Sequence, residues 1–410
     1  QFSTIDTLWE EFYLQKITMV IPTYWGPPED KDIEEEKVFD HPTPLDQEGT
    51  IGRVLESLKV LERSDFSIVL IVASTSSKIE KEVVNKVKDI SRPFRGKYDL
   101  KLLYHKNLKS LREKLLSKNV IPDACSLINL DNYSSVRNIC SIAGILNDSD
   151  LVVFIDDDEV FEDSNFIDKA VEHVGKERDG EKILAVAGYY INSDGNYKLD
   201  ETGVPFWKRE SWNNVIAMNQ AFDQIIGKRP RLKLTPFVFG GNMVIHRELL
   251  VSVPFDPAIT RGEDIDFLIN ARISGKKFWL DNTLSIVHRA PSKKSPQWLS
   301  FREDIKRFLY EKKKVNDHSH IKEVSKNALM PYPGLFVGED LEDRILKANK
   351  LLYREYEKAG GRYGMEQCDI NEEIVKSGKL RDIDTRTWLE RLISNWRVLT
   401  RAAAGVGIPD

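Results

Sequence analysis

The chain has 410 residues and a mass of 47.2 kDa, and its 60 basic and 65 acidic side chains give a net charge of −5. At about 150 residues per domain, one large elaborated domain or two domains are expected. The near-neutral charge argues against an obligate nucleic-acid binder, which is normally basic. No apolar run reaches the roughly 18 residues that a membrane span needs.

The cysteine content and the first residues suggest the compartment. Cys125, Cys140 and Cys368 are too few and too dispersed for a disulfide framework or a zinc cluster. Reduced cysteines suit a cytoplasmic protein. Charged residues, Glu10 and Glu11 among them, stand where a signal peptide has its apolar core, so we expect no export.

Strands and helices alternate over the first 155 or so residues. An apolar strand at 17–23, which Pro22 is expected to end, precedes an excursion from 26 to 50. That excursion has nine acidic and two basic residues between 29 and 48. The alternation predicts an α/β fold with a mainly parallel sheet and helices on both faces, whose ligands bind at the carboxyl ends of the strands. The further elements expected here are helices at 50–61, 78–90 and 134–143 and strands at 66–73, 100–104 and 151–155.

The pattern changes after Asp158. Strands are expected at 183–190, 237–245 and 277–287, with a helix at 262–274. Beyond residue 291 the chain is helical and charged, which predicts a domain over 1–295 and a helical C-terminal extension over 296–410. The last helix has an apolar stripe that is typical of core packing. A homodimer interface is the alternative, and the polar face lacks the basic bias of a membrane-surface helix. The stripe comprises Trp388, Leu389, Leu392, Trp396 and Leu399.

The sharpest chemical feature is the carboxylate run Asp156, Asp157 and Asp158 directly after a buried strand. Like charges packed together are costly unless a cation or several donors compensate. In an extended backbone Asp156 and Asp158 point to the same side. Hard oxygen ligands of this kind suit Mg²⁺ or Mn²⁺ holding a diphosphate, whereas a solvated acidic turn is the structural alternative.

Other features are weaker when taken singly. Glu263 and Asp264 fall at an expected helix start, where the helix dipole favours carboxylates, and Asp266 is a second candidate beside Asp264. The glycines before Asn242 allow close backbone approach to a ligand or a bulge. His288 ends an expected strand, where a histidine is usually packed or solvated. A basic cluster at 228–233 suits either an anionic acceptor or a solvated loop.

Taken in order, these features resemble a family 2-like glycosyltransferase of the GT-A fold. The ordered set is Val20 to Tyr24, Ser135 to Asn138, Phe154 to Asp158, Gly240 to Asn242, Gly262 to Asp266, and His288. The Asp-x-Asp motif alone is weak, but the ordered set at these spacings is specific. The resemblance covers residues 16 to 290, and the excursion at 26–50 is longer than the usual loop after the first strand.

The resemblance implies roles for individual residues. Nucleotide-sugar contacts would come from Pro22, Thr23, Tyr24, Arg137, Asp156, Asp157, Gly240, Gly241 and Asn242. Asp158 and His288 would hold Mg²⁺ or Mn²⁺. Asp264, paired with Glu263, would be the general base of an inverting enzyme.

The implied activity is transfer of a hexose, glucose or mannose being favoured, from a UDP- or GDP-sugar to a hydroxyl of a soluble small or saccharide acceptor. A retaining enzyme acting on a glycerate-like or phosphorylated small acceptor is the alternative. A non-catalytic sugar-nucleotide-binding or scaffold protein is the alternative from another class, against which the intact carboxylates argue.

Two further enzyme classes fit less well. A phosphatase of the Asp-x-Asp type would want a small residue and a threonine after its aspartates, where this chain has Glu159 and Val160. A nucleotidyltransferase would want a glycine-rich loop after the first strand, and residues 22–25 do not supply one.

Overall fold

The computed structural model describes residues 15–31, 33–291, 295–380 and 382–409. Glu10 and Glu11, on which the expectation of no signal peptide rests, lie outside these ranges. Within them, no helix is long and apolar enough to cross a membrane. Cys125, Cys140 and Cys368 are buried free thiols.

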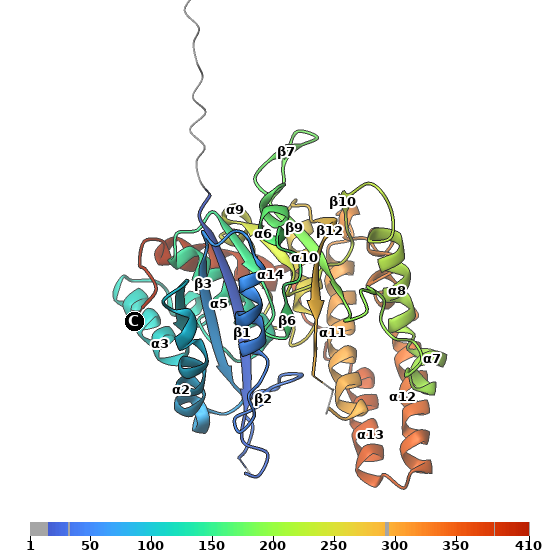
Figure 1. Cartoon of the computed structure of the whole chain (residues 1–410). Coiled ribbons are helices and arrows are strands. Elements are labelled where there is room, and N and C mark those ends of the chain that lie inside the picture. Colours follow the sequence, from blue (N-terminus) through green and yellow to red (C-terminus); the bar gives the residue numbers. More distant parts are fainter. Residues whose placement is uncertain (1–14, 32, 292–294, 381, 410) are drawn as a thin grey trace, which may run out of the picture.

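The core of the molecule is one twisted sheet (Figure 1). Its strand order is β10 (Leu232–Leu234), β12 (Trp279–His288), β9 (Ala185–Ile191), β11 (Met243–His246), β5 (Leu151–Phe154), β1 (Ile17–Gly26), β3 (Ser67–Ser74) and β4 (Asp99–Leu103). The neighbours β5, β1, β3 and β4 are parallel, as are β9 and β12, whereas β11 is antiparallel to both β5 and β9. Short strands β2 (Thr43–Pro44) and β6 (Glu159–Val160) pair with β1 and β12. The predicted mainly parallel sheet is confirmed.

Helices cover both faces of the sheet, because alternate residues of each buried strand enter two separate apolar cores. In β1, Met19 and Ile21 enter the core under α1 (Ile51–Ser57), α2 (Glu80–Ser91) and α6 (Phe166–Val171). Val20 and Tyr24 enter the opposite core. That core also receives α3 (His105–Ser117), α5 (Tyr133–Leu146), α10 (Glu263–Ile273), α11 (Gln297–Asp317) and α14 (Thr385–Ala403).

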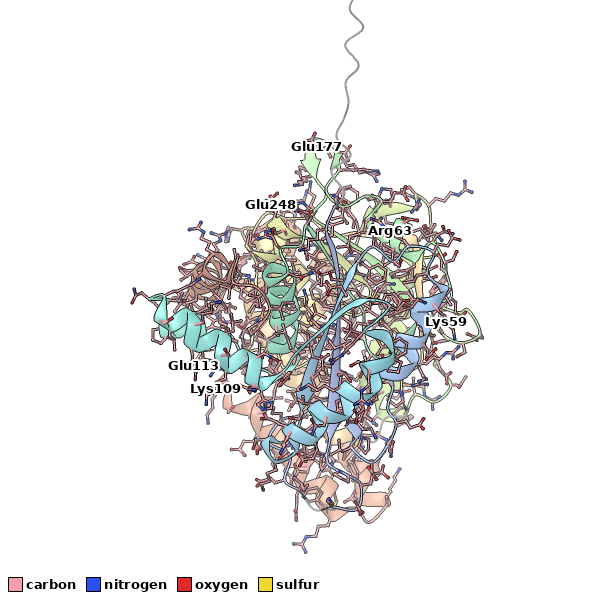
Figure 2. The ribbon with its side chains drawn as sticks, turned by 60° about the vertical axis from the view of Figure 1, so that its left-hand side comes forward. Lys59, Arg63, Lys109, Glu113, Glu177 and Glu248 are labelled. Carbon is pink, nitrogen blue, oxygen red and sulfur yellow. The ribbon has the colours of Figure 1, made fainter. Side chains whose placement is uncertain are left out.

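Helix α3, which the sequence reading missed, shows the same division between core and solvent. Leu108, Leu111 and Leu115 are buried, and the charged Lys109 and Glu113 stand on the exposed side (Figure 2). Helix α13 (Arg362–Ser377) was also missed. It lies beside α11 and α12 (Leu341–Lys358), while α7 (Phe206–Ser211) and α8 (Asn214–Ile225) lie nearby (Figure 1).

The prediction that Pro22 ends the first strand is wrong, because β1 continues to Gly26. Pairing with β5 stops at Val20, whose carbonyl accepts from the Ile155 N–H. Alternate residues direct their backbone groups to the same side of a strand, so the Pro22 nitrogen faces the side where β1 has lost its neighbour. A proline there removes no ladder hydrogen bond.

The strand expected at 237–245 begins only at Met243. Before it, the Gly240 N–H donates to the Asp264 carboxylate and the Gly241 N–H donates to the Tyr190 hydroxyl. Side-chain oxygens therefore accept the hydrogen bonds that a neighbouring strand would otherwise accept. The pattern of apolar residues in the sequence does not reveal this.

The C-terminal helices are joined to the sheet region by buried polar contacts. Lys314 of α11 donates to Asp256 and to Asp266 of α10, and all three side chains are fully buried. Leu389 and Trp396 of the α14 stripe are buried too, and the Trp396 indole donates to the Leu250 carbonyl. The stripe is thus covered within the chain, so a homodimer through these helices would need another face. The domain division at 295 stays a prediction.

Close packing of α5 on β5 makes Gly144 a sensitive position. A Cβ at Gly144 would lie 2.2 Å from a methyl carbon of Val152. We expect Gly144→Ala to lower the free energy of unfolding by about 1–3 kcal/mol, although alanine favours helices. In the matched variant Gly52→Ala of α1 the nearest atom is 3.8 Å away. Urea unfolding should show that Gly52→Ala is neutral or stabilising, and equal destabilisation of both variants would contradict this explanation.

Candidate active site

A pocket of about 350 Å³ opens at the carboxyl ends of β1 and β5. It brings together most of the predicted site residues from six separate chain segments. Those lining it are Tyr24, Arg137, Asp156, Asp157, Asp158, Gly240, Glu263, Asp264 and His288.

Four predicted contact residues do not line the pocket. Pro22 and Thr23 are enclosed in β1, where the Thr23 hydroxyl donates to Asp157 across 2.6 Å. Gly241 lies beneath the site, because a Cβ there would meet Asp156 at 2.6 Å. Asn242 is buried and donates to the Tyr189 and Leu284 carbonyls, so its amide fixes strands. These residues shape the floor of the site.

Arg137 connects two of the predicted carboxylates. Its Nη2 donates to Asp156 at 2.7 Å and its Nε to Glu263 at 3.2 Å, and the side chain is only 4% exposed. Burial lowers the pKa of Arg137. The neighbouring Asp156, Tyr24 and Glu263 raise it by more, so the Arg137 pKa lies well above its ordinary value. Burial raises the pKa of Glu263 to about 7 despite Arg137.

The three aspartates of the carboxylate run contact different neighbours, because β5 ends at Phe154 and the chain turns at 157–158. The alternation argument made for an extended strand therefore does not apply, yet all three aspartates line the pocket. Asp156 faces Arg137 and Asp158 faces His288. Burial and the neighbouring Asp158 raise the pKa of Asp157 to about 8, against the Thr23 hydrogen bond.

Asp158 and His288 form the pair that could hold a divalent cation. The Asp158 Oδ2 lies 3.3 Å from the His288 Nε2, because the pairing of β6 with β12 sets residue 288 opposite Glu159. Among the described residues, no group of three or more histidine, cysteine or acidic side chains is arranged as a metal site. Carboxylate oxygen and imidazole nitrogen are ligands that suit Mg²⁺ or Mn²⁺. These ions commonly bind only one or two carboxylates and keep their other coordination positions for phosphates and water.

Asp264 sits at the other side of the same pocket. Its Oδ2 accepts from the Gly240 N–H at 3.0 Å and its Oδ1 from the Ile265 N–H at 2.8 Å. Burial raises its pKa, while Arg307 and Arg137 oppose that rise. The alternative carboxylate, Asp266, is wrong as a pocket residue because it is fully buried against Lys314.

Sequence reasoning missed several lining residues. The Tyr190 hydroxyl contacts the Asp156 Oδ2 at 3.4 Å, and its ring stacks on His288 with centroids 4.8 Å apart. Its place at the end of an expected strand could have marked it. The others are Asp40, His41, Thr50, Tyr133, Arg261 and Pro291. Three of these come from the excursion at 26–50, which folds over the end of β3 through bonds to the Thr75 carbonyl.

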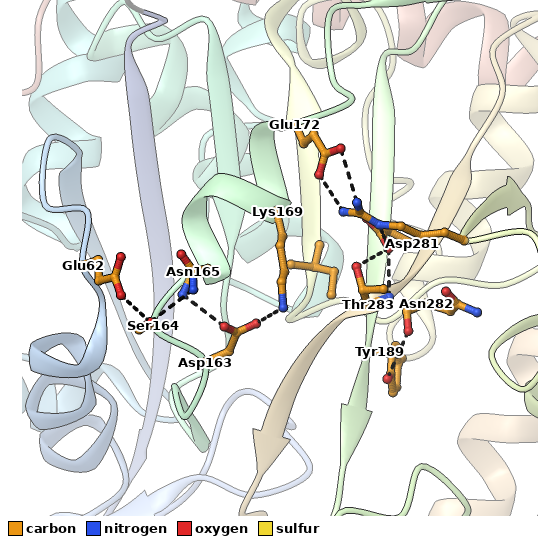
Figure 3. A network of polar contacts seen from close by, with 12 residues as sticks. Glu62, Asp163, Ser164, Asn165, Lys169, Glu172, Tyr189, Asp281, Asn282 and Thr283 are labelled. Carbon is orange, nitrogen blue, oxygen red and sulfur yellow. Dashed lines mark hydrogen bonds and ion pairs between the residues drawn. The ribbon is translucent and has the colours of Figure 1, made fainter.

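The basic cluster at 228–233 does not line the pocket. Arg231 instead donates to Asp281 and Glu172, both at 2.7 Å. Figure 3 shows these two acidic side chains in a polar network in which Asp281 also accepts from Thr283. Lys233 donates to the Ile225 carbonyl. Arg231 and Lys233 therefore bind partners within the fold, and an anionic acceptor at this cluster stays a prediction.

No protein-family model and no curated protein matches the chain. Solved structures do. A mannosyltransferase from Pyrobaculum calidifontis in complex with GDP-Man and Mn²⁺ is 13% identical, with 96% of this chain and 87% of that chain covered and a TM-score of 0.44. Glucosyl-3-phosphoglycerate synthase from Mycobacterium tuberculosis in complex with Mn²⁺, UDP and phosphoglyceric acid is 18% identical, with 72% and 76% covered and a TM-score of 0.37. GalNAc-T7 with UDP, GalNAc and Mn²⁺ is 11% identical, with 76% and 53% covered and a TM-score of 0.40.

Similarity at this level assigns no residue role and no substrate to this chain. The sheet topology described above agrees on its own with the predicted GT-A fold class, a mainly parallel sheet with helices on both faces and a helical C-terminal extension.

Proposed function

We propose that the chain is a metal-dependent glycosyltransferase that moves a hexose from a UDP- or GDP-sugar to a hydroxyl of a small or saccharide acceptor. One observation carries the proposal: a cation-binding pair and a buried carboxylate open on the same pocket. Asp158 with His288 forms the pair, and Asp264 is the carboxylate. An inverting, metal-dependent transferase uses both, since the metal stabilises the diphosphate released from the donor and the carboxylate removes a proton from the acceptor.

Each side chain has a task in this reaction. Asp158 and His288 would hold Mg²⁺ or Mn²⁺, which when bound neutralises negative charge on the leaving diphosphate. Arg137 fixes the Asp156 carboxylate, which can then accept hydrogen bonds from ribose or sugar hydroxyls. The Gly240 and Ile265 N–H groups fix the Asp264 carboxylate, which takes the proton of the acceptor hydroxyl as that oxygen attacks.

Incubation with a panel of UDP- and GDP-sugars and Mn²⁺, with candidate acceptors, tests the proposal. We look for release of the nucleoside diphosphate together with a glycosylated product. Binding of a sugar nucleotide without any turnover across the panel would favour the non-catalytic alternative. The anomeric configuration of the product, read by NMR, separates the inverting reaction proposed here from a retaining one.

Asp158→Ala should abolish the part of sugar-nucleotide binding that depends on Mn²⁺, because it removes the carboxylate donor of the pair. Calorimetric titrations with and without Mn²⁺ should differ strongly for the unmodified chain and coincide for the variant. The control is Glu162→Ala, which removes a nearby acidic side chain that is 60% exposed and pairs with Arg289. If Asp158→Ala keeps its Mn²⁺ dependence, the metal assignment is wrong.

A further inference from the structure

The guanidinium of Arg307, in α11 of the C-terminal extension, is buried against the start of α10. The side chain is 8% exposed and lies directly on Gly262, where a Cβ would stand 2.1 Å from the Arg307 Cζ. Gly262 also has a φ of +74°, a left-handed conformation that favours glycine. The extension therefore contacts the backbone two residues before Asp264, at a place where only glycine leaves room.

The contacts of Arg307 hold it there. Its Nε donates to Glu311 at 2.8 Å and its Nη1 to the Tyr332 hydroxyl at 3.3 Å. Within the described part of the chain its Nη2 is buried without a hydrogen-bond partner. A buried guanidinium with an unused N–H is costly. The guanidinium packs on Gly262, two residues before Asp264, so we ask what its charge does for that carboxylate.

Several charged groups face Asp264 from the elements around it. Burial raises its pKa, Arg307 of α11 opposes that rise most strongly, and Arg137 of α5 opposes it less. Asp156 after β5 and Glu263 of α10 act in the opposite direction. Glu311, which shares the Arg307 charge, has its own pKa raised by burial to about 7. Arg307 is thus the main cation acting on the carboxylate, and it comes from outside the sheet region.

We propose that Arg307 is a positioning residue, which fixes the first turn of α10 and sets its positive charge against the helix start that carries Asp264, the proposed base. The inference rests on the transferase function proposed above and deepens it, because it makes the helical C-terminal extension part of the site. The extension would then support proton transfer even though none of its described residues lines the pocket.

The test compares Arg307→Met, which removes the charge, with Arg307→Lys, which keeps it, across a pH series of kcat and KM. Loss of the cation should move the acidic limb of the Arg307→Met kcat profile upward by about one pH unit or more. One unit corresponds to about a tenfold loss of kcat on that limb. The donor KM should stay close to that of the unmodified chain, and Arg307→Lys should restore the limb. Lys306→Met, one residue away and exposed, is the matched control.

A folded Arg307→Met enzyme whose limb coincides with that of the unmodified chain overturns the proposal. Equal loss of kcat in the methionine and lysine variants without a shifted limb also overturns it, since it would mean steric support alone. If Arg307→Met does not fold, Arg307→Gln takes its place, with the same expectations. A ¹³C titration of the Asp264 carboxyl, assigned by its absence in Asp264→Asn, follows the shift without substrate. A chain with no transferase activity but a shifted Asp264 titration would reject the function and keep the Arg307 effect.

Discussion

Asp264→Asn should lower kcat by about 10²–10⁴-fold, the range typical of a lost general base, while the sugar nucleotide still binds. The carboxylate is fixed by the Gly240 and Ile265 N–H groups, so it needs no reorientation during the reaction. An asparagine of the same shape removes the proton acceptor and keeps the volume. The measurements are kcat from product formation and donor affinity by calorimetry.

The same carboxylate predicts the pH dependence of the unmodified chain. Burial raises the pKa of Asp264, and a base must be deprotonated to act. We therefore expect kcat to fall as the pH drops through a value above the ordinary range of an aspartate. In Asp264→Asn this acidic limb should disappear along with most of the rate.

Two outcomes would contradict the assignment. Unchanged kcat in Asp264→Asn would mean that Asp264 is not the base. Loss of donor binding together with kcat would mean that the side chain mainly supports the α10 start, since an asparagine amide set against the Gly240 N–H can disturb that loop. Asp163→Asn, in a carboxylate paired with Lys169 away from the pocket, controls for the removal of one acidic charge.

The sequence predicted the part of this site that depends on strand ends. Asp156, Asp157 and Asp158 follow a buried strand, and the ends of parallel strands meet at one edge of the sheet, so they were expected near Tyr24. Glu263 and Asp264 also followed from a local pattern, the acidic start of a helix. The local periodicity of apolar residues and the local composition are enough to predict such positions.

The parts that failed depend on partners distant in sequence. Pro22 stays within β1 only because β5 stops pairing at Val20, which no local pattern reveals. Asp264 and Asp266 look equivalent in the sequence, yet α10 turns the first toward the pocket and the second toward Lys314, 48 residues further on. The choice between them was made by packing of the C-terminal helices.

Lys314→Met should lower the free energy of unfolding by about 3–5 kcal/mol, the cost typical of removing one member of a buried ion cluster. The ammonium donates to Asp266 at 2.6 Å, to Asp256 at 2.9 Å and to Asn270 at 3.0 Å, and Lys314 and both aspartates are 0% exposed. Asp256 also accepts from the Trp388 indole of α14. The cluster therefore joins α10, α11 and α14, and methionine fills the space of the stem without supplying the charge.

The loss should depend on pH in a definite direction. Without Lys314, burial raises the pKa of both aspartates in the folded state above their unfolded values. A raised carboxyl pKa favours folding at low pH and loses that contribution as the pH rises through the folded pKa. Urea unfolding should therefore show a larger deficit for Lys314→Met at pH 8 than at pH 5.

A neighbouring lysine and a second substitution make this prediction specific. Lys313→Met removes a partly exposed partner of Asp317 one residue away, and such pairs contribute at most about 1 kcal/mol. Adding Asp266→Asn to Lys314→Met should recover part of the stability, because it removes one of the two carboxylates left without a cation. Equal deficits for the two lysine variants, or no recovery in the double variant, would mean that the helical extension is held by its apolar contacts and not by this buried charge.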